Sequence, residues 1–187
     1  MKLDTLIDDI YGQLSKLSEG QEFNLSDADL DFTVDRIKDS LRAWARPSER
    51  NSEFTLRMSN VGRPARQLWY EQNLPVETSA PSPSLQIKFL YGHILEEILL
   101  MLVRASGHEV TDEQKEVTVK GVKGHLDCKI DGEVVDIKTA SKFSFNKFRE
   151  GRLREDDPFG YMSQLAGYEE AEKSSEGGFL VINKESG

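Results

Sequence analysis

The sequence of 187 residues has one cysteine, Cys128, and no run of 18 or more apolar residues. A single cysteine cannot form an internal disulfide, and it is too few for a zinc finger or an iron–sulfur cluster. The acidic N-terminus MKLDTLIDDI also lacks the apolar core of a signal peptide. We therefore expect a cytoplasmic, globular protein without a membrane-spanning segment.

Positive charge is scarce overall but concentrated locally. The net charge of −9 argues against broad, nonspecific affinity for nucleic acid. Residues 41–70, however, carry six arginines against two glutamates, and residues 138–154 carry six basic side chains against one glutamate. These two segments predict a local track for anions, although solvated charge on helix faces explains either segment equally well by itself.

The order of apolar patterns predicts an α/β (α+β) fold with a central mixed β-sheet flanked by helices. Helical spacing covers four stretches, at 3–17, from a cap at Ser26 to before Pro47, at 87–103, and at 157–173 with Asp157 as N-cap and Pro158 as first position. Strands are predicted at 114–120, in a hairpin over 124–141, and at 177–183. Residues 143–156 are a loop or a short helix, and the proline-rich residues 73–84 form a linker or a surface loop.

These patterns divide the chain into an N-terminal helical extension, residues 1–58, and a core domain, residues 59–187. The ending KESG resembles the start of another turn, which leaves open that a further strand belongs to the domain.

The hairpin places charged residues on one face. Asp131-Gly132 is a strong signal for a two-residue type I′ turn, which sets Asp127 opposite Asp136 and His125 opposite Lys138. Opposed carboxylates repel each other, and a divalent cation such as Mg²⁺ would offset the repulsion. Alternatively, both aspartates face solvent on an edge hairpin, or the register differs by one residue.

A third carboxylate is predicted on the apolar helix at 87–103. Glu96 and Glu97 interrupt its apolar face, and a buried carboxylate needs a partner or a metal. Three carboxylates and a lysine, Lys138, suit metal-assisted phosphodiester hydrolysis, in which the lysine orients the attacking water and offsets charge near the phosphate.

The motif Asp136-Ile137-Lys138, preceded by Asp127 and a helical glutamate, resembles the core of the PD-(D/E)XK nuclease superfamily. Gln164 and Tyr168 match the Q-x-x-x-Y motif of its RecB-like branch, which includes phage exonucleases and CRISPR-associated nucleases. The resemblance covers roughly residues 59–183. This sequence departs from the family pattern in two places. The CRISPR-associated nucleases have an iron–sulfur ligand where this chain has Arg63. In the first motif, the spacing from Gly92 favours Glu96 over Glu97 as the metal ligand.

The resemblance implies a restriction-endonuclease-like core and a Mg²⁺ site that also accepts Mn²⁺. By it, the metal ligands are Glu96, Asp127, Asp136 and the backbone carbonyl of Ile137, and Lys138 is the catalytic lysine. DNA contacts are expected from Gln164, Tyr168, Arg63, Arg66 and Lys142. No cofactor-binding residues and no iron–sulfur cluster are expected.

We therefore expect a Mg²⁺-dependent deoxyribonuclease, an exonuclease in phage-type DNA processing or recombination, in the host cytoplasm if the protein is viral. Its partner is DNA, and the N-terminal helices offer a surface for a recombination or replication protein. The alternatives are a catalytically inactive nuclease-fold module that binds nucleic acid or protein, and a structure-specific endonuclease.

Overall fold

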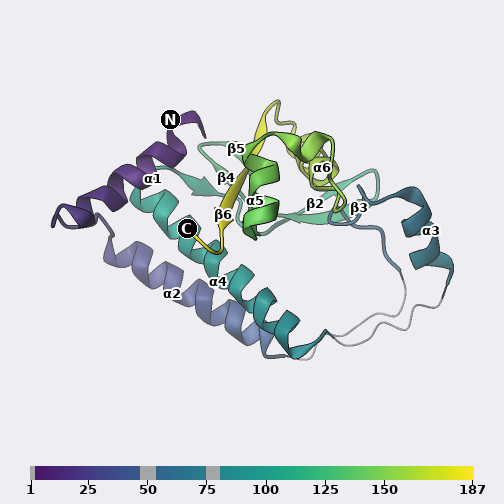
Figure 1. Ribbon diagram of the computed structural model, residues 1–187, viewed down its shortest axis with the longest axis horizontal. Coiled ribbons are helices and arrows are strands. Elements are labelled where there is room, and N and C mark those ends of the chain that lie inside the picture. The colour runs from purple at the N-terminus through teal and green to yellow at the C-terminus, as the bar shows by residue number, and fades with distance from the viewer. Residues whose placement is uncertain (1–2, 47–53, 75–80) are drawn as a thin grey trace. The chain divides into compact units, whose positions relative to one another are not determined.

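A computed structural model describes residues 3–46, 54–74 and 81–187 (Figure 1). Its helices are α1 (Leu3–Ser18), α2 (Asp27–Trp44), α3 (Ala65–Asn73), α4 (Pro83–Ala105), α5 (Lys142–Arg149) and α6 (Tyr161–Glu172), with a 3₁₀ turn η1 (Arg152–Arg154). Its strands are β1 (Val110–Thr111), β2 (Lys115–Val119), β3 (Val122–Leu126), β4 (Cys128–Ile130), β5 (Glu133–Ala140) and β6 (Gly177–Asn183). Within the described residues, no helix is both long enough and apolar enough to cross a membrane.

The strands form two sheets. One has the order β1-β4-β5-β6, with β1 and β4 antiparallel and β5 and β6 parallel, and the other is the antiparallel pair β2-β3. The mixed α+β class predicted from the sequence is thereby confirmed. The central residues of the predicted loop at 73–84, residues 75–80, lie outside the described part of the chain.

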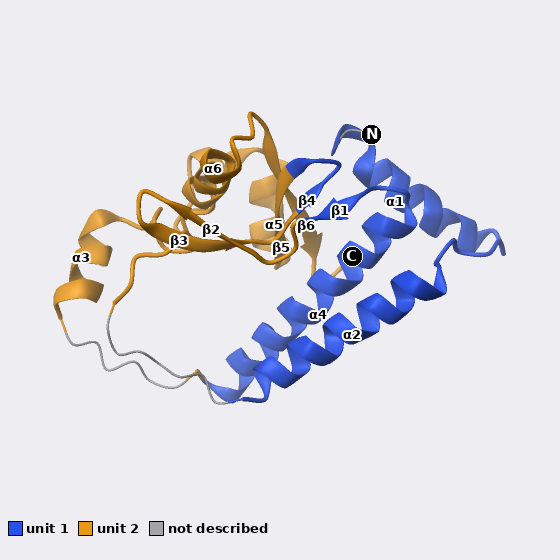
Figure 2. Ribbon diagram, turned by 180° about the vertical axis from the view of Figure 1, so that it is seen from behind, with its two compact units in different colours: residues 1–47, 82–111, 129–133 blue, residues 48–81, 112–128, 134–187 orange. Residues whose placement is uncertain are grey.

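The chain divides into two compact units, coloured separately in Figure 2. Unit 1 comprises residues 1–47, 82–111 and 129–133, and unit 2 comprises residues 48–81, 112–128 and 134–187. In unit 1, α4 packs against both α1 and α2, so a helix that we predicted to be part of the core domain joins the N-terminal helices. The predicted boundary after residue 58 stays a prediction.

Helix ends in unit 1 follow local signals. Ser26 accepts a hydrogen bond from the backbone N–H of Asp29 at 3.0 Å, as expected of an N-cap. Of the two glutamates considered on α4, the buried one is Glu97, which is 4% exposed and lies 3.2 Å from Arg36 of α2. An ion pair between two helices therefore accounts for the burial of Glu97.

The core of unit 2 lies under α6. Six buried side chains form it: Met58, Val117, Leu126, Val134, Leu165 and Tyr168. Gly124 of β3 has no side chain here because a Cβ atom would lie 2.5 Å from the Met58 side chain and 3.0 Å from the Tyr168 ring. Packing at this distance brings the edge of the β2-β3 sheet directly against α6.

The start of α6 differs from the prediction. The helix begins at Tyr161 rather than at Pro158, because Gly160 takes a left-handed conformation (φ +76°) that interrupts helical geometry. Asp157 still caps the helix, since its carboxylate accepts hydrogen bonds from the N–H groups of Tyr161 (3.0 Å) and Met162 (2.8 Å). The prediction that Asp157 caps this helix is confirmed, but the predicted first residue of the helix, Pro158, is wrong.

Candidate functional site

The predicted turn connects β4 and β5. Asp131 and Gly132 both have positive φ, +51° and +88°, which is the requirement of a type I′ turn. Asp127 lies where the chain passes from β3 to β4, and its Oδ2 accepts a hydrogen bond from the backbone N–H of Ile137 at 2.7 Å. The turn and this hydrogen bond bring the Asp127 carboxylate beside the centre of β5.

The register prediction is wrong further from the turn. His125 pairs with Glu116 of β2 and not with Lys138. The strand that we treated as continuous from residue 124 is two strands, β3 and β4, and these belong to different sheets. Asp127 lies between these two strands. The Asp131-Gly132 turn therefore predicts the pairing of β5 with β4, but not the pairing of the residues before Asp127.

Asp136 and Lys138 share one face of β5, as the alternation of a strand predicts. Asp136 is fully buried, and Lys138 Nζ contacts its Oδ2 atom. Lys138 Nζ also lies 5.1 Å from the centre of the Tyr161 ring. Within the described residues, neither oxygen of Asp136 accepts a hydrogen bond of good geometry, which is unusual for a buried carboxylate.

These surroundings favour the protonated form of Asp136. Burial is the largest cause and raises the pKa of Asp136 to about 7. The positive charge of Lys138 opposes this rise in pKa, and the negative charge of Asp127 reinforces it. Asp127 and Asp136 are therefore neighbouring carboxylates whose charges affect each other, and Lys138 is the cation beside Asp136.

Gln164 and Tyr168 lie one turn apart on α6, as their spacing predicts. The Gln164 side-chain amide donates a hydrogen bond of 3.0 Å to the hydroxyl of Tyr168, which is 2% exposed. Burial raises the pKa of Tyr168 to about 12; the hydrogen bond from Gln164 opposes the rise, and the charges of Asp136 and Asp127 add to it. Contact of either residue with DNA stays a prediction.

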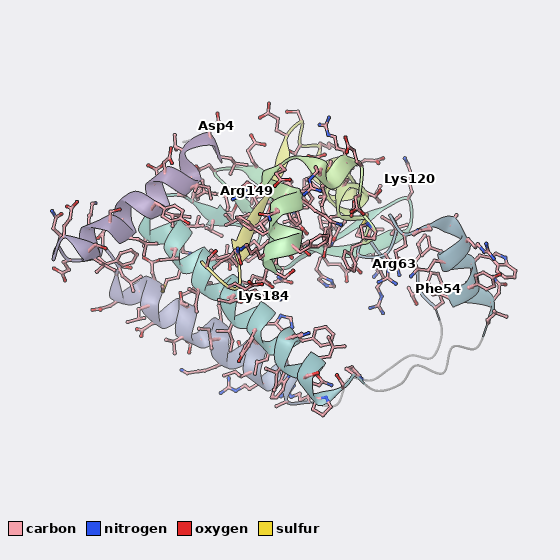
Figure 3. All side chains as sticks on the ribbon, in the orientation of Figure 1. Asp4, Phe54, Arg63, Lys120, Arg149 and Lys184 are labelled. Carbon is pink, nitrogen blue, oxygen red and sulfur yellow. The ribbon has the colours of Figure 1, made fainter. Side chains whose placement is uncertain are left out.

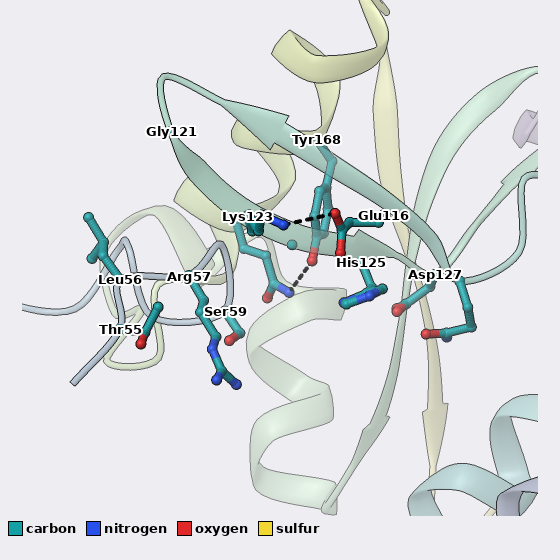
Figure 4. A pocket seen from close by; sticks show the side chains of 13 residues that line it. Thr55, Leu56, Arg57, Ser59, Glu116, Gly121, Lys123, His125, Asp127 and Tyr168 are labelled. Carbon is teal, nitrogen blue, oxygen red and sulfur yellow. Dashed lines mark hydrogen bonds and ion pairs between the residues drawn. The ribbon is translucent and has the colours of Figure 1, made fainter. Parts of the chain in front are cut away.

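A cavity of about 730 Å³ opens beside Asp127 (Figure 4). Its walls come from the residues before α3, from the β2-β3 sheet and from α6, and the polar lining residues include Arg57, Ser59, Gln114, Glu116, Lys123, His125, Asp127, Gln164 and Tyr168. All of them belong to unit 2. Lys123 and Glu116 form an ion pair of 3.1 Å across the two strands.

Sequence reasoning missed two side chains near this site. Tyr161 lies three and seven residues before Gln164 and Tyr168, so helical periodicity alone places the three on one face and could have identified it. Arg57 belongs to the basic segment at 41–70, but no periodic pattern distinguishes it from the other arginines there.

The other predicted DNA contacts lie outside this cavity lining in the described residues. Arg63, at the entrance to α3 (Figure 3), forms an ion pair of 3.1 Å with Glu71. The guanidinium of Arg66 lies 5.6 Å from the centre of the Tyr70 ring. Lys142 is exposed at the first position of α5. A role of these three residues in DNA binding stays a prediction.

The donor set for a metal consists of the two aspartates. Within the described residues, no group of three or more His, Cys, Asp and Glu side chains is arranged to hold a metal ion. Mg²⁺ often uses only one or two protein carboxylates, so Asp127 and Asp136 meet its needs, and the Asp136 oxygens, which accept no well-formed hydrogen bond within the described residues, are suitable ligands. Ile137 lies between Asp136 and Lys138, and Glu96 is half-buried on α4 of unit 1; their roles as ligands stay predictions.

Comparison of the chain with family models, with curated proteins and with solved structures gives no match.

Proposed function

We propose that the protein is a metal-dependent DNA nuclease that hydrolyses phosphodiester bonds. The observation that carries the proposal is Asp136: a fully buried aspartate, with no well-formed hydrogen bond to its oxygens within the described residues, beside a second carboxylate and a lysine. A buried carboxylate without well-formed hydrogen bonds is costly for stability, and such costs are usually retained where a ligand is bound.

Asp127 and Asp136 would hold Mg²⁺, with Mn²⁺ as a substitute, and Glu96 and the Ile137 carbonyl would complete the ligands. When bound, the ion would activate water and stabilise the negative charge that develops on the phosphate. The protein's own contribution is to fix the two carboxylates. The hydrogen bond from the Ile137 N–H holds Asp127, and complete burial on β5 holds Asp136.

Lys138 is the group that would contact the reacting phosphate. The Lys138 side chain is 18% exposed, so its ammonium can contact a substrate while it remains beside Asp136. There it would orient the attacking water and offset the charge on the phosphate oxygens. The Tyr161 ring supports the ammonium through a cation–π contact.

The resemblance to the PD-(D/E)XK superfamily supports a restriction-endonuclease-like core and a RecB-like, exonuclease type of activity on DNA ends. A nuclease of this type would act in phage-type DNA processing or recombination in the cytoplasm. The N-terminal helices would then bind a recombination or replication protein. Gln164, Tyr168, Arg63, Arg66 and Lys142 would contact the DNA.

The test compares cleavage of end-labelled linear DNA with Mg²⁺ and with EDTA, for the wild-type protein, Lys138→Ala and Lys120→Ala. Lys120 is an exposed lysine at the β2-β3 turn, so its replacement controls for the loss of one positive charge. We expect cleavage that EDTA abolishes, that Lys138→Ala lowers by about 10²–10⁴-fold and that Lys120→Ala leaves unchanged. Cleavage that survives both EDTA and Lys138→Ala would falsify the mechanism.

A second candidate is an inactive module that keeps the same architecture and binds nucleic acid or protein. The contact between Lys138 and Asp136 favours it, because a buried carboxylate with its own counter-ion has less need of a metal. Calorimetric titration with Mn²⁺ separates the two: heat of binding that Asp136→Asn removes supports the nuclease, and absence of binding supports the module. Cleavage of circular DNA without ends would instead indicate an endonuclease.

A further inference from the structure

The cavity beside Asp127 has the size of a small-molecule site. Its volume of about 730 Å³ lies within the range of about 300–1,000 Å³ that proteins use to enclose ligands of this size. It can therefore accept part of one nucleic-acid strand, whereas a duplex is too wide to enter. Figure 4 shows Asp127 and His125 toward one end of the lining, and Arg57 and Leu56 toward the other.

Arg57 is fixed in this wall by its backbone. Its N–H donates to the side chain of Asn60 at 2.8 Å, and the next residue, Met58, donates its N–H to the Lys123 carbonyl of β3 at 2.8 Å. The guanidinium is exposed and has no ion-pair or hydrogen-bond partner within the part of the chain that the structure describes. An arginine with a fixed backbone and no partner is ready to bind an anion bidentately.

His125 is a second lining side chain that is exposed and available to a ligand. It is exposed on β3, and among the described residues its ring has no hydrogen-bond partner. Lys123, by contrast, already pairs with Glu116. The exposed ring offers a surface on which a base can lie, since imidazole and other aromatic rings stack on unpaired bases.

We infer that this cavity binds one nucleotide of a single strand next to the phosphate to be cleaved, with Arg57 on its phosphate and His125 against its base. The inference rests on the proposed nuclease function for the identity of the ligand. It extends that function by naming the substrate form, an unpaired strand or a frayed DNA end, and by naming residues that position it.

The experiment measures binding and cleavage separately. Fluorescence anisotropy in EDTA, where no cleavage occurs, follows a short labelled oligothymidylate and the duplex of the same sequence. The variants are Arg57→Gln, Arg57→Lys and, as matched control, Lys184→Gln. Lys184 is an exposed lysine outside the cavity (Figure 3), so its replacement removes the same charge. The Arg57 side chain is exposed, so circular dichroism should show all variants folded.

For Arg57→Gln, we expect about tenfold weaker binding of the single strand, because a charge-assisted hydrogen bond to phosphate is lost. The slope of log K against log salt concentration should become shallower by about 0.7, the value for one phosphate contact on a single strand. Arg57→Lys should keep the salt slope and lose part of the affinity. Lys184→Gln should change neither, and binding of the duplex should change less than binding of the single strand.

The outcomes separate the two proposals. If the wild-type protein cleaves DNA but Arg57→Gln binds the single strand as Lys184→Gln does, this inference is wrong and the nuclease function stands. If Arg57→Gln selectively weakens binding of the single strand but neither the wild-type protein nor any variant cleaves DNA, the cavity is a nucleotide site and the nuclease function is wrong. An equal loss for single strand and duplex overturns the assignment to an unpaired nucleotide.

Discussion

Asp131, which is half-buried, and Asp136, which is fully buried, are two aspartates of one hairpin in opposite chemical situations. Asp131, in the turn, lies 2.7 Å from His108 Nδ1 and accepts a hydrogen bond from the Glu109 N–H at 3.0 Å. Asp136, on β5, accepts no well-formed hydrogen bond within the described residues and has Lys138 as its cation. One carboxylate is satisfied by the fold, and the other is not.

The pKa values shift in opposite directions for this reason. Burial tends to raise the pKa of Asp131, but the hydrogen bonds from His108 and from the Glu109 N–H outweigh it and lower the pKa below its usual range. Burial of Asp136 is not outweighed, and its pKa rises to about 7. Burial alone therefore does not identify a functional carboxylate; burial without hydrogen-bond donors does so more reliably.

The ring of His108 explains why the Asp131 cluster is structural. Its Nε2 lies 3.2 Å from Asp9 of α1, so each ring nitrogen faces a carboxylate oxygen. Carboxylates only accept hydrogen bonds, so both contacts form together when both ring nitrogens carry a proton. The cluster joins α1, the residues after α4 and the β4-β5 turn, and it leaves no buried oxygen to attract a ligand.

The largest predicted effect is a gain in stability from Asp136→Asn. The folded-state pKa of about 7 lies above the unfolded value of 3.8, so the contribution of Asp136 to stability is present below about pH 4 and is lost as pH rises through 7. At about pH 8 the amide removes this cost, and we expect the free energy of unfolding to rise by up to about 4 kcal/mol.

Urea denaturation of both proteins from about pH 4 to pH 8 measures this effect, since the stability of the wild-type protein should fall across the range more steeply than that of Asp136→Asn. Asp8→Asn, which changes an exposed aspartate of α1, is the control and should follow the wild-type curve. If Asp136→Asn is no more stable than wild type at pH 8, the carboxylate is satisfied and the contrast with Asp131 disappears.

Mg²⁺ should stabilise the wild-type protein through the same carboxylate. A ligand at about 100 times its Kd adds about 2.7 kcal/mol to the free energy of unfolding if it binds only the folded state. We expect this increase at saturating Mg²⁺ in the wild-type protein and its loss in Asp136→Asn, measured as the shift in thermal midpoint. An equal shift in both proteins would place the ion elsewhere.

His108→Ala tests the satisfied cluster. Without the ring, the nearly buried carboxylate of Asp131 loses a donor, and we expect a loss of about 2 kcal/mol near neutral pH; Asp9 is 39% exposed and water replaces part of its interaction. Because the pKa of Asp131 is lowered, its contribution is present above its unfolded value and lost as pH falls through its folded value. The difference from wild type should therefore narrow below about pH 4.

Urea denaturation of His108→Ala and of the exposed-histidine control His93→Ala measures this difference. Nuclease activity should not depend on His108 beyond the effect on stability. If the His108→Ala protein is as stable as the His93→Ala protein, the hydrogen bonds around Asp131 contribute nothing to the free energy of unfolding.

Local signals predicted the elements well. The cap at Ser26, the Asp131-Gly132 turn, the alternation that places Asp136 with Lys138, and the helical spacing of Gln164 and Tyr168 each depend on residues close in sequence. For such features the chemistry of the residue determines the conformation, and the structure agrees with the prediction.

Features that depend on distant parts of the chain were not predicted. The chain leaves one sheet for another at Asp127, and this depends on the pairing of β3 with β2 rather than on the residues around Asp127. The Arg36–Glu97 pair joins residues of two helices, and the cavity at Arg57 forms only when the segment before α3 lies beside β3. Periodicity describes one element at a time and contains no information on which elements become neighbours.

The smallest predicted effect concerns the Tyr168 hydroxyl, where the structural and functional interpretations of a buried polar group differ. Tyr168→Phe removes the acceptor of the Gln164 hydrogen bond, and since Gln164 is only half-buried, we expect a loss of about 1 kcal/mol in the free energy of unfolding. Tyr11→Phe, on an exposed tyrosine of α1, is the control and should cost less.

Cleavage kinetics of Tyr168→Phe then separate the two roles. If the hydroxyl only holds Gln164 in place for packing, KM for DNA and kcat should both remain at their wild-type values after correction for the folded fraction. If the pair contacts the strand near Asp127, KM should rise severalfold while kcat changes little, because a positioning contact is lost and the reacting groups are intact. A fall in kcat at constant KM would instead connect the hydroxyl to the Asp127–Asp136 pair, whose charges already raise its pKa.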